Sequence, residues 1–184
     1  MSEHPILALV GMCGSGKSVA CESFAARGWQ QVYFGQVTMD ELAARGLEKN
    51  EQNERSVREE LRREHGPAAF AKLLIPTIDK KSTDGPTILD GLYSWSEYKV
   101  LKERYGSRLT VVAVIADRAV RYRRLTTRSL RPLTPQQAAG RDVAEIEKLE
   151  KGGPIAMADR FLLNNGDINA LQTQIDLLIK EYER

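Results

Sequence analysis

The sequence predicts an α/β fold in which a five-stranded parallel β-sheet lies between helices, and three observations predict it. Short apolar runs alternate along the chain with longer segments of helical periodicity. Several of these runs are apolar at every position, which is typical of strands buried on both faces of a parallel sheet. Glycine directly follows four of the predicted helical segments, where it is well suited to end a helix. Together these features indicate a layered sheet built from strand–helix units.

The first half of the chain is predicted to hold two strands and a long helical segment. Its elements are a strand at 6–10, a helix from about Lys17 that ends before Gly28, a strand at 31–34, and helices at 37–45, 51–65 and from Pro67 to about 78. The first strand is continuously apolar, and Gly46 and Gly66 separate the later helices. In the helix 51–65 only Val57 and Leu61 interrupt the charges, so we expect this helix to contribute little to the core.

The second half continues the alternation. Its elements are a strand at 87–90, a helix at 94–105, a strand at 109–115, an arginine-rich helix at 118–129, a helix after Thr134, a strand at 160–163 and a last helix after Asp167. Thr134 and Gln137 have the spacing of a capping box, with Pro135 at the first helical position. Asp117 and Asp167 are suited to cap the helices that follow them. We therefore expect one domain of 184 residues.

Composition excludes several classes of protein. Hydrophobic residues make up 42% of the chain and charged residues 28%, which is typical of a globular protein and excludes a disordered one. The formal net charge is only +2, so no global attraction to nucleic acid or to a membrane is expected. Cys13 and Cys21 lack the spacing of a zinc site or a disulfide framework. With no basic leader and no long apolar run, the sequence favours a cytoplasmic protein.

One motif carries chemistry. The segment Gly11-Met-Cys-Gly-Ser-Gly16-Lys17-Ser18 matches G-x-x-x-x-G-K-[ST] and lies between a predicted strand and a predicted helix, as that pattern requires. Gly14 and Gly16 allow the main chain to wrap around a polyphosphate, and Lys17 is suited to reach the β- and γ-phosphates of ATP. We therefore expect a P-loop NTPase fold. The expected nucleotide contacts are Gly11, Met12, Cys13, Gly14, Ser15, Gly16, Lys17, Ser18 and Val19.

A Mg²⁺ ion is expected beside this loop. The Ser18 hydroxyl is the ligand that the motif supplies, and a second, acidic residue is needed. Asp90 ends a predicted strand and precedes Gly91, which places its carboxylate at the carboxyl edge of the sheet. Asp90 is therefore predicted to hold Mg²⁺, directly or through water, or to act as a base toward the phosphoryl acceptor.

Six arginines gather in fourteen residues. They are Arg118, Arg121, Arg123, Arg124, Arg128 and Arg131. On a continuous helix Arg121, Arg124, Arg128 and Arg131 would share one face, where they could grip phosphates. A nucleic-acid patch and a plain solvated face are the alternatives. No aromatic side chain is interleaved among the arginines as in a stacking platform for bases, so the sequence favours phosphate binding.

The chain resembles the P-loop nucleotide kinases, in particular the adenylate-kinase-related and dephospho-CoA-kinase-like proteins common in archaea. The resemblance rests on the motif at 11–18 and, in order, on Phe34-Gly35, the run 61–66, Asp90-Gly91, the run 121–125, Arg141-Asp142 and the stretch from Ala158-Asp159 to Gly166. It implies a phosphoryl-transfer enzyme whose core comprises 1–34, 79–125 and 146–184. A helical acceptor-binding insertion at 35–78 and a mobile lid at 126–145 are likewise implied.

The resemblance also implies roles for particular residues. Arg124 and Arg128 would contact the donor phosphates, Arg141 would close over the site, and the turn from Asn164 to Gly166 would lie near the adenine. The expected acceptor-binding residues are Phe34, Gly35, Arg58, Arg62, Asp90 and Gly91. Arg58 and Arg62 lie four residues apart, on one side of their helix, and a solvated surface is the alternative for both.

The sequence does not decide which molecule accepts the phosphoryl group. A nucleoside monophosphate is the leading expectation and dephospho-CoA the alternative, while a regulatory ATP-binding module without catalysis is a third interpretation. Relatives often carry an arginine shortly after the glycine that matches Gly35, whereas this chain has Gln36, Thr38 and Met39 there. We expect a small-molecule partner, neither nucleic acid nor membrane, and leave a homo-oligomer open.

Overall fold

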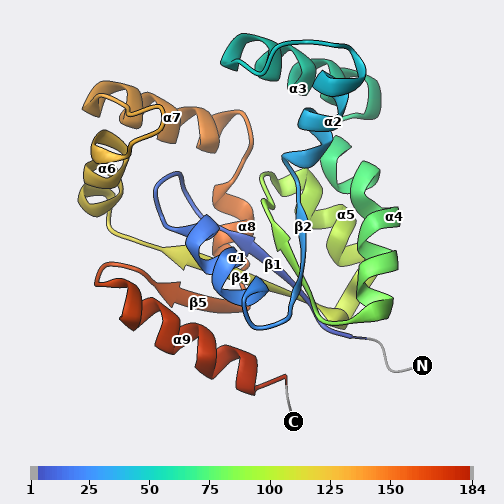
Figure 1. Ribbon diagram of the computed structural model, residues 1–184, viewed down its shortest axis with the longest axis vertical. Coiled ribbons are helices and arrows are strands. Elements are labelled where there is room, and N and C mark those ends of the chain that lie inside the picture. The colour runs from blue at the N-terminus through green and yellow to red at the C-terminus, as the bar shows by residue number, and fades with distance from the viewer. Residues whose placement is uncertain (1–3, 183–184) are drawn as a thin grey trace.

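The computed structural model describes residues 4–182 and contains one five-stranded sheet (Figure 1). The strands are β1 (Ile6–Val10), β2 (Gln30–Tyr33), β3 (Thr87–Asp90), β4 (Leu109–Ile115) and β5 (Arg160–Leu163). Their order in the sheet is β2-β3-β1-β4-β5, and every pairing is parallel. This confirms the predicted α/β fold with a five-stranded parallel sheet. Strand β1 is central, and helical crossovers connect the parallel strands.

Helices cover both faces of the sheet. They are α1 (Lys17–Ala25), α2 (Gln36–Ala44), α3 (Glu51–His65), α4 (Ala69–Asp84), α5 (Trp95–Tyr105), the 3₁₀ turn η1 (Gly106–Arg108), α6 (Arg118–Thr127), α7 (Pro135–Glu147), α8 (Gly152–Ala156) and α9 (Ile168–Lys180). Helices α1 and α9 pack on one face, and α4 and α5 on the other (Figure 1). None of the helices between residues 4 and 182 is long and apolar enough to cross a membrane.

Strand β1 contributes side chains to two hydrophobic cores, one on each face of the sheet. Its five residues are completely buried, as the continuous apolar run requires. Ile6 and Ala8 pack in the core under α4 and α5, whereas Leu7 and Leu9 pack in the core under α1 and α9. Alternate residues of one strand therefore serve opposite faces.

Two helical segments lie above the carboxyl ends of the strands. Helices α2 and α3 lie on one side of this edge and α6 and α7 on the other (Figure 1). The loop after β1 emerges between the two segments, at the edge where ligands bind in sheets of this kind.

One expectation is confirmed and one needs correction. As expected, helix α3 contributes little to the core, where Val57 and Leu61 form a narrow buried stripe against its neighbours. Helix α6 ends at Thr127, and the backbone of Arg128 is extended with ψ 144°. Arg128 and Arg131 therefore do not share a helical face with the preceding arginines.

The ends of the helices agree with most of the capping signals. Thr134 forms the expected capping box with Gln137, and Asp167 accepts a hydrogen bond from the amide of Ala170. Asp117 lies at the N-cap position of α6, but its side chain makes no capping hydrogen bond. The short helix α8 was not predicted from the sequence, because five residues are too few for a periodic pattern.

Glu97 is a buried acid in the first turn of α5. One carboxylate oxygen accepts hydrogen bonds from the amides of Tyr93 and Ser94, at 2.8 and 3.0 Å. The other is buried and has no hydrogen-bond partner among the described residues. Burial raises the pKa of Glu97 to about 7, because the charged carboxylate is poorly solvated there.

We expect Glu97→Gln to flatten the dependence of stability on pH. A carboxyl with a raised pKa binds more protons in the folded state, so the wild-type protein loses stability as the pH rises from about 4.5 to about 7. The loss is on the order of 3 kcal/mol when complete. Urea unfolding at several pH values measures it, with the exposed Glu103→Gln as the control. An unchanged pH slope in Glu97→Gln would contradict this account.

Candidate functional site

The loop between β1 and α1 has the backbone that the glycine pattern predicts. Gly14 and Gly16 adopt φ angles of 81° and 99°, a region that favours glycine. A Cβ added at Gly16 would lie 2.1 Å from Nδ2 of Asn164, so a larger residue there would clash. The ammonium of Lys17 donates a hydrogen bond to the carbonyl of Gly11 at 2.7 Å, folding back over the loop. The loop therefore forms a narrow cradle below one ammonium.

Helix α1 begins directly beneath this cradle. Its N-cap residue is Gly16, which provides no side-chain hydrogen bond to the first turn. The amides of Lys17, Ser18 and Val19 therefore have no side-chain cap, and the helix N-terminus carries a partial positive charge. Such an arrangement is suited to bind an anion.

Two side chains support the loop from the side of β5 and α6. The Asn164 amide donates to the carbonyl of Ser15 at 2.8 Å, and Arg124 lies within 3.4 Å of the Asn164 oxygen. Asn164 is buried against the loop, whereas Gly166 lies exposed in the turn beyond it. The Nη1 atom of Arg124 is buried and has no partner among residues 4–182, and burial lowers the pKa of this guanidinium. Arg124 thus has a donor left for an anion.

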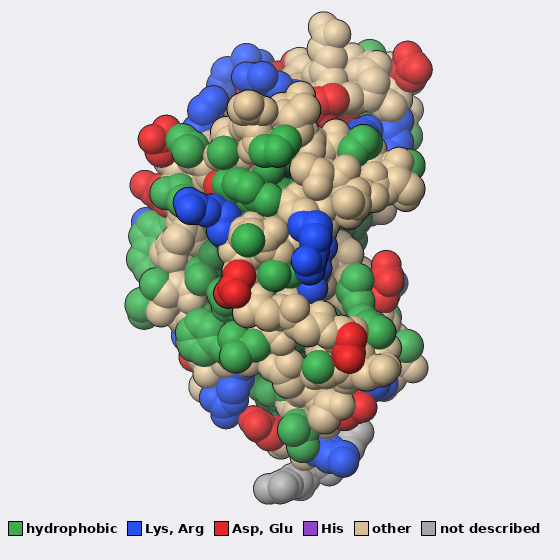
Figure 2. Space-filling view, turned by 90° about the vertical axis from the view of Figure 1, so that its left-hand side faces the viewer, with side chains coloured by type: hydrophobic (Ala, Val, Ile, Leu, Met, Phe, Trp, Pro, Cys, Tyr) green, Lys and Arg blue, Asp and Glu red, His purple; other side chains and the backbone are tan. Residues whose placement is uncertain are grey.

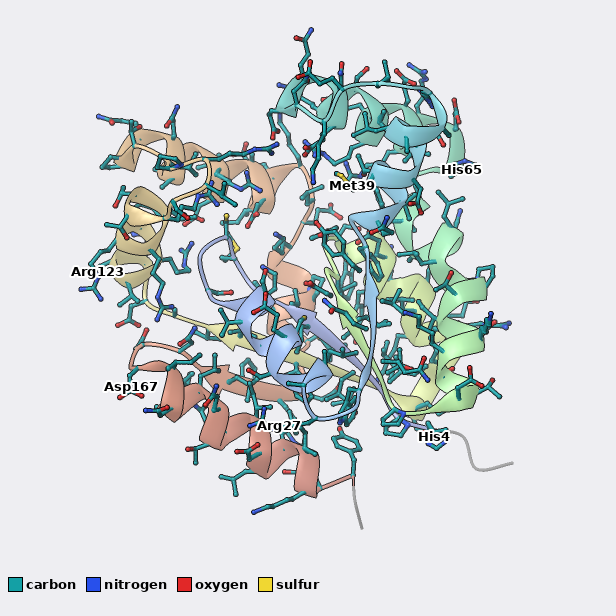
Figure 3. The ribbon with its side chains drawn as sticks, in the orientation of Figure 1. His4, Arg27, Met39, His65, Arg123 and Asp167 are labelled. Atoms are coloured by element: carbon teal, nitrogen blue, oxygen red, sulfur yellow. The ribbon has the colours of Figure 1, made fainter. Side chains whose placement is uncertain are left out.

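Arg121 holds the loop from above. Its guanidinium donates to the Cys13 carbonyl at 3.1 Å and forms a bidentate pair with Asp142 of α7, with both distances 2.7 Å. Arg121 is buried, so this pair links α6, α7 and the loop. Arg121 therefore positions the loop, while Arg123 of the same helix points outward (Figure 3). The arginine cluster does not act as one phosphate-gripping face.

Sequence reasoning missed two further residues at the loop. The Glu145 carboxylate accepts a hydrogen bond from the Cys13 amide at 3.0 Å, and the Lys151 ammonium lies 2.9 Å from its other oxygen. Both residues are buried, with 7% and 2% of their surface exposed. In the sequence they belong to an ordinary charged stretch, so no local signal distinguishes them. Burial first, and then the charge of Lys151, lower the pKa of Lys17 to about 8.

Ser18 and Asp90, the two predicted Mg²⁺ ligands, lie on the wall of the same cavity. This cavity of about 610 Å³ lies beside β2, and Gln31 donates to the Asp90 carboxylate at 3.1 Å. Burial raises the pKa of Asp90 above that of an ordinary aspartate. The described residues contain no cluster of three metal-binding side chains. One hydroxyl and one carboxylate fit Mg²⁺ when phosphate oxygens and waters complete its coordination.

The residues expected to bind the acceptor differ from one another in burial and in contacts. Phe34 and Gly91 are buried, and Gly35 precedes α2 as its N-cap residue. Arg58 forms ion pairs with Glu51 and Glu54 of its own helix, at 3.1 and 3.4 Å. Its charge is therefore already compensated.

Arg62 differs from Arg58. Its guanidinium lies 4.9 Å from the centre of the Phe70 ring, and its Nε atom is buried without a hydrogen-bond partner among the residues described. Burial lowers the pKa of Arg62, while the nearby charge of Glu97 opposes that shift. Arg62 therefore keeps an unused donor.

The segment from 126 to 145 contacts both the loop and α3. Arg128 donates to the carbonyl of Arg131 at 2.8 Å, which fixes the turn after α6. Arg131 in turn pairs with Glu54 of α3 at 3.0 Å, and Arg141 lies 3.7 Å from Glu145. Arg128 and Arg141 thus lie in the segment above the loop, joined to their neighbours by polar contacts.

Comparison with known proteins assigns the family. A family model described as an AAA domain, AAA_18, matches residues 7–150. The chain belongs to the AAA_18 family. This AAA_18 chain is also 32% identical over 183 residues to a UPF0200 protein of Thermococcus gammatolerans, covering 97% of this chain and 96% of the relative. A UPF0200 protein of Aeropyrum pernix is 36% identical over 169 residues, covering 91% and 88%. The chain therefore belongs to the same family as these UPF0200 proteins.

Solved structures agree on the fold of this AAA_18 chain. A shikimate kinase from Bacteroides thetaiotaomicron matches with a TM-score of 0.62 at 15% identity, covering 98% of this chain and 99% of the other. A dephospho-CoA kinase from Campylobacter jejuni matches with a TM-score of 0.55 at 14% identity, covering 98% of both. The resemblance to P-loop kinases drawn from the sequence is confirmed at the level of the fold.

We expect Asp90→Asn to stabilise the protein while weakening Mg²⁺ binding. A carboxylate whose pKa is raised by burial costs stability as the pH rises from its ordinary pKa of about 4 through its raised pKa in the folded protein, so the gain should grow over that interval and be complete above it. Thermal unfolding with and without Mg²⁺ and ATP measures both effects. A variant that is less stable at neutral pH, or that keeps the same Mg²⁺ titration, would contradict the expectation.

Proposed function

We propose that this protein is an ATP- and Mg²⁺-dependent small-molecule kinase that transfers the γ-phosphoryl group to a nucleoside monophosphate. The observation that carries the proposal is the loop at 11–18. Its glycine conformations, the folded-back Lys17 and the uncapped start of α1 all favour a polyphosphate. Ser18 and Asp90 on the wall of one cavity add the oxygen ligands for a cation.

The chain's own residues supply positioning and positive charge. In phosphoryl transfer the γ-phosphoryl group passes through a loose in-line transition state, so the protein has little covalent work to do. We propose that Lys17 and Arg124 compensate charge on the donor phosphates, because Lys17 folds over the loop and Arg124 has a donor free beside it. Mg²⁺, held by Ser18 and Asp90 when bound, supplies further neutralisation of the phosphate charge.

Arg62 supports an acceptor that carries a phosphate. It extends from α3 of the segment 35–78, which we propose to be the acceptor-binding insertion. Leaving a buried donor without a partner costs about 1–3 kcal/mol, so an anion that restores the hydrogen bond would bind favourably. Arg58, by contrast, already has two carboxylate partners.

The segment 126–145 has the contacts expected of a lid. Arg131 reaches Glu51 and Glu54 of α3, so this segment bridges to the proposed insertion above the sheet edge. Closing the site in this way excludes water, which would otherwise accept the phosphoryl group. Arg128 and Arg141 are the lid arginines that we propose to act on the donor phosphates, with Asn164 and Gly166 on the adenine side.

Dephospho-CoA kinase activity is the second candidate, and one observation favours it. An acceptor hydroxyl must lose a proton, whereas the phosphate of a nucleoside monophosphate is already an anion at neutral pH. The raised pKa of Asp90 makes this carboxylate a better base toward a hydroxyl. Both acceptors carry a phosphate that Arg62 suits, so Asp90 and not Arg62 distinguishes them.

The surface charge and the free cysteines fit this proposal. Figure 2 shows Lys and Arg side chains spread over one face among acidic and uncharged ones, without a continuous basic patch of the kind that nucleic acid favours. Cys13 and Cys21 are free thiols, which suits the reducing cytoplasm. We therefore propose a cytoplasmic enzyme whose partner is a small molecule.

We expect Lys17→Ala to lower phosphoryl transfer about 10²- to 10⁴-fold, because it removes the ammonium above the phosphates. ADP release measured with the common nucleoside monophosphates and with dephospho-CoA identifies the acceptor and the loss together. The exposed Lys180→Ala is the matched control and should keep wild-type activity. Near-normal turnover by Lys17→Ala would refute the role of this residue. Tight ATP binding without turnover of any acceptor would instead favour a regulatory ATP-binding module.

We expect Arg62→Ala to raise the KM for the acceptor on the order of tenfold, because it removes a charged partner of the acceptor's phosphate. The KM for ATP should change little, since Arg62 extends from α3 and not from the loop. The exposed neighbour Arg63→Ala controls for lost charge on the same helix. Equal effects of the two variants, or an effect on ATP alone, would remove Arg62 from the acceptor site.

A further inference from the structure

Lys151 is a buried ammonium that the proposed mechanism has not used. It precedes α8, at the end of the stretch that leads down from α7 beside the loop (Figure 1). Only 2% of its surface is exposed, and its ammonium lies 5.7 Å from the centre of the Tyr93 ring. Its charged partner is Glu145, at 2.9 Å. An ammonium is costly to bury, so its position beside the loop calls for a physical reason.

Glu145 occupies the position of an anion on the loop. The Cys13 amide belongs to the glycine-rich loop, whose main-chain donors are suited to phosphate, and here that amide donates to a carboxylate at 3.0 Å. The same carboxylate is paired with Lys151 and lies 3.7 Å from Arg141. One loop amide and two cationic side chains thus lie around the two oxygens of the Glu145 carboxylate. This is the pattern of partners that a phosphate group would take.

Lys151 and the motif lysine both adjoin the loop, because Lys17 donates to the Gly11 carbonyl at 2.7 Å and Lys151 pairs with the Glu145 carboxylate that accepts from the Cys13 amide. The pKa of Lys17 is lowered by burial first and by the charge of Lys151 next, as expected for two ammonium groups at one loop. Because the motif lysine reaches the β- and γ-phosphates, a second ammonium beside it lies at that end of the nucleotide. An anion carrying more charge than one carboxylate would compensate both.

We propose that Lys151 is a phosphate-binding residue of this site, and that Glu145 holds its ammonium and the Cys13 amide until the β,γ end of the nucleotide displaces the carboxylate. The proposal rests on the proposed function, since it takes a nucleoside triphosphate as the ligand. It gives the stretch after the proposed lid a direct part in binding. It also gives Glu145 two tasks, which are to compensate Lys151 in the free protein and to compete with the phosphate.

Calorimetric titration of the full-length protein with ATP, ADP and inorganic tripolyphosphate tests this proposal. Lys151→Met should weaken ATP binding on the order of tenfold to a hundredfold, because a charge-assisted hydrogen bond to phosphate is lost. The loss should be larger for ATP than for ADP, whereas a merely structural role would lower both affinities equally. Lys151→Arg should restore most of the affinity. The exposed Lys148→Met is the matched control and should bind like the wild type.

Glu145→Gln tests the competing carboxylate. It should bind ATP on the order of threefold to tenfold more tightly, because no negative charge remains beside the phosphate. The exposed Glu147→Gln is its control. If Lys151→Met fails to fold because Glu145 is left unpaired, the double variant Lys151→Met with Glu145→Gln removes both charges. It should fold and still bind ATP more weakly than Glu145→Gln alone.

The outcomes separate this proposal from the proposed function. If the wild type binds ATP and Lys17→Ala weakens that binding while Lys151→Met does not, the inference about Lys151 is overturned and the kinase proposal stands. Unchanged or weaker binding by Glu145→Gln overturns the competition by the carboxylate. If the wild type binds neither ATP nor tripolyphosphate, the kinase proposal fails and this inference fails with it.

Discussion

The conformation of the loop after β1 is the constraint on which the rest of the structure depends. Gly14 and Gly16 allow it, but glycines alone would leave the loop mobile. Two hydrogen bonds to Cys13 fix the loop. The Cys13 amide donates to Glu145, and the Cys13 carbonyl accepts from Arg121. A flexible sequence thus becomes a fixed anion cradle through polar contacts made by α6 and α7.

Exposed and buried charges have different effects in this protein. The exposed ion pair of α3 between Arg55 and Glu59 lies in solvent and contributes little to stability. Other charges are buried at the loop, where Glu145 compensates Lys17 and Lys151 only in part. Such an arrangement costs stability in the free protein and is suited to binding a highly charged ligand. The same groups that the fold tolerates poorly are those that a polyphosphate would need.

Much of the fold follows from local pattern. The buried run at 6–10, the capping box at Thr134 and the cap at Asp167 are local features, and the structure has all three. The one-face interpretation of the arginines was wrong because helical periodicity assumes a continuous helix, and α6 ends at Thr127. The small core contribution of α3 also follows from its sequence, because Val57 and Leu61 are the apolar residues that it can bury.

By itself the sequence determined the family of the site. A glycine pattern between a strand and a helix specifies a phosphate loop because backbone freedom and helix polarity are local properties. Only the tertiary structure decided which distant charges complete that loop. Lys151 and Glu145 lie more than a hundred residues from Cys13 along the chain, and nothing in their local sequence marks them as different from surface charges. Their role is set by packing, because the desolvation that makes a charge significant arises only when the chain folds around it.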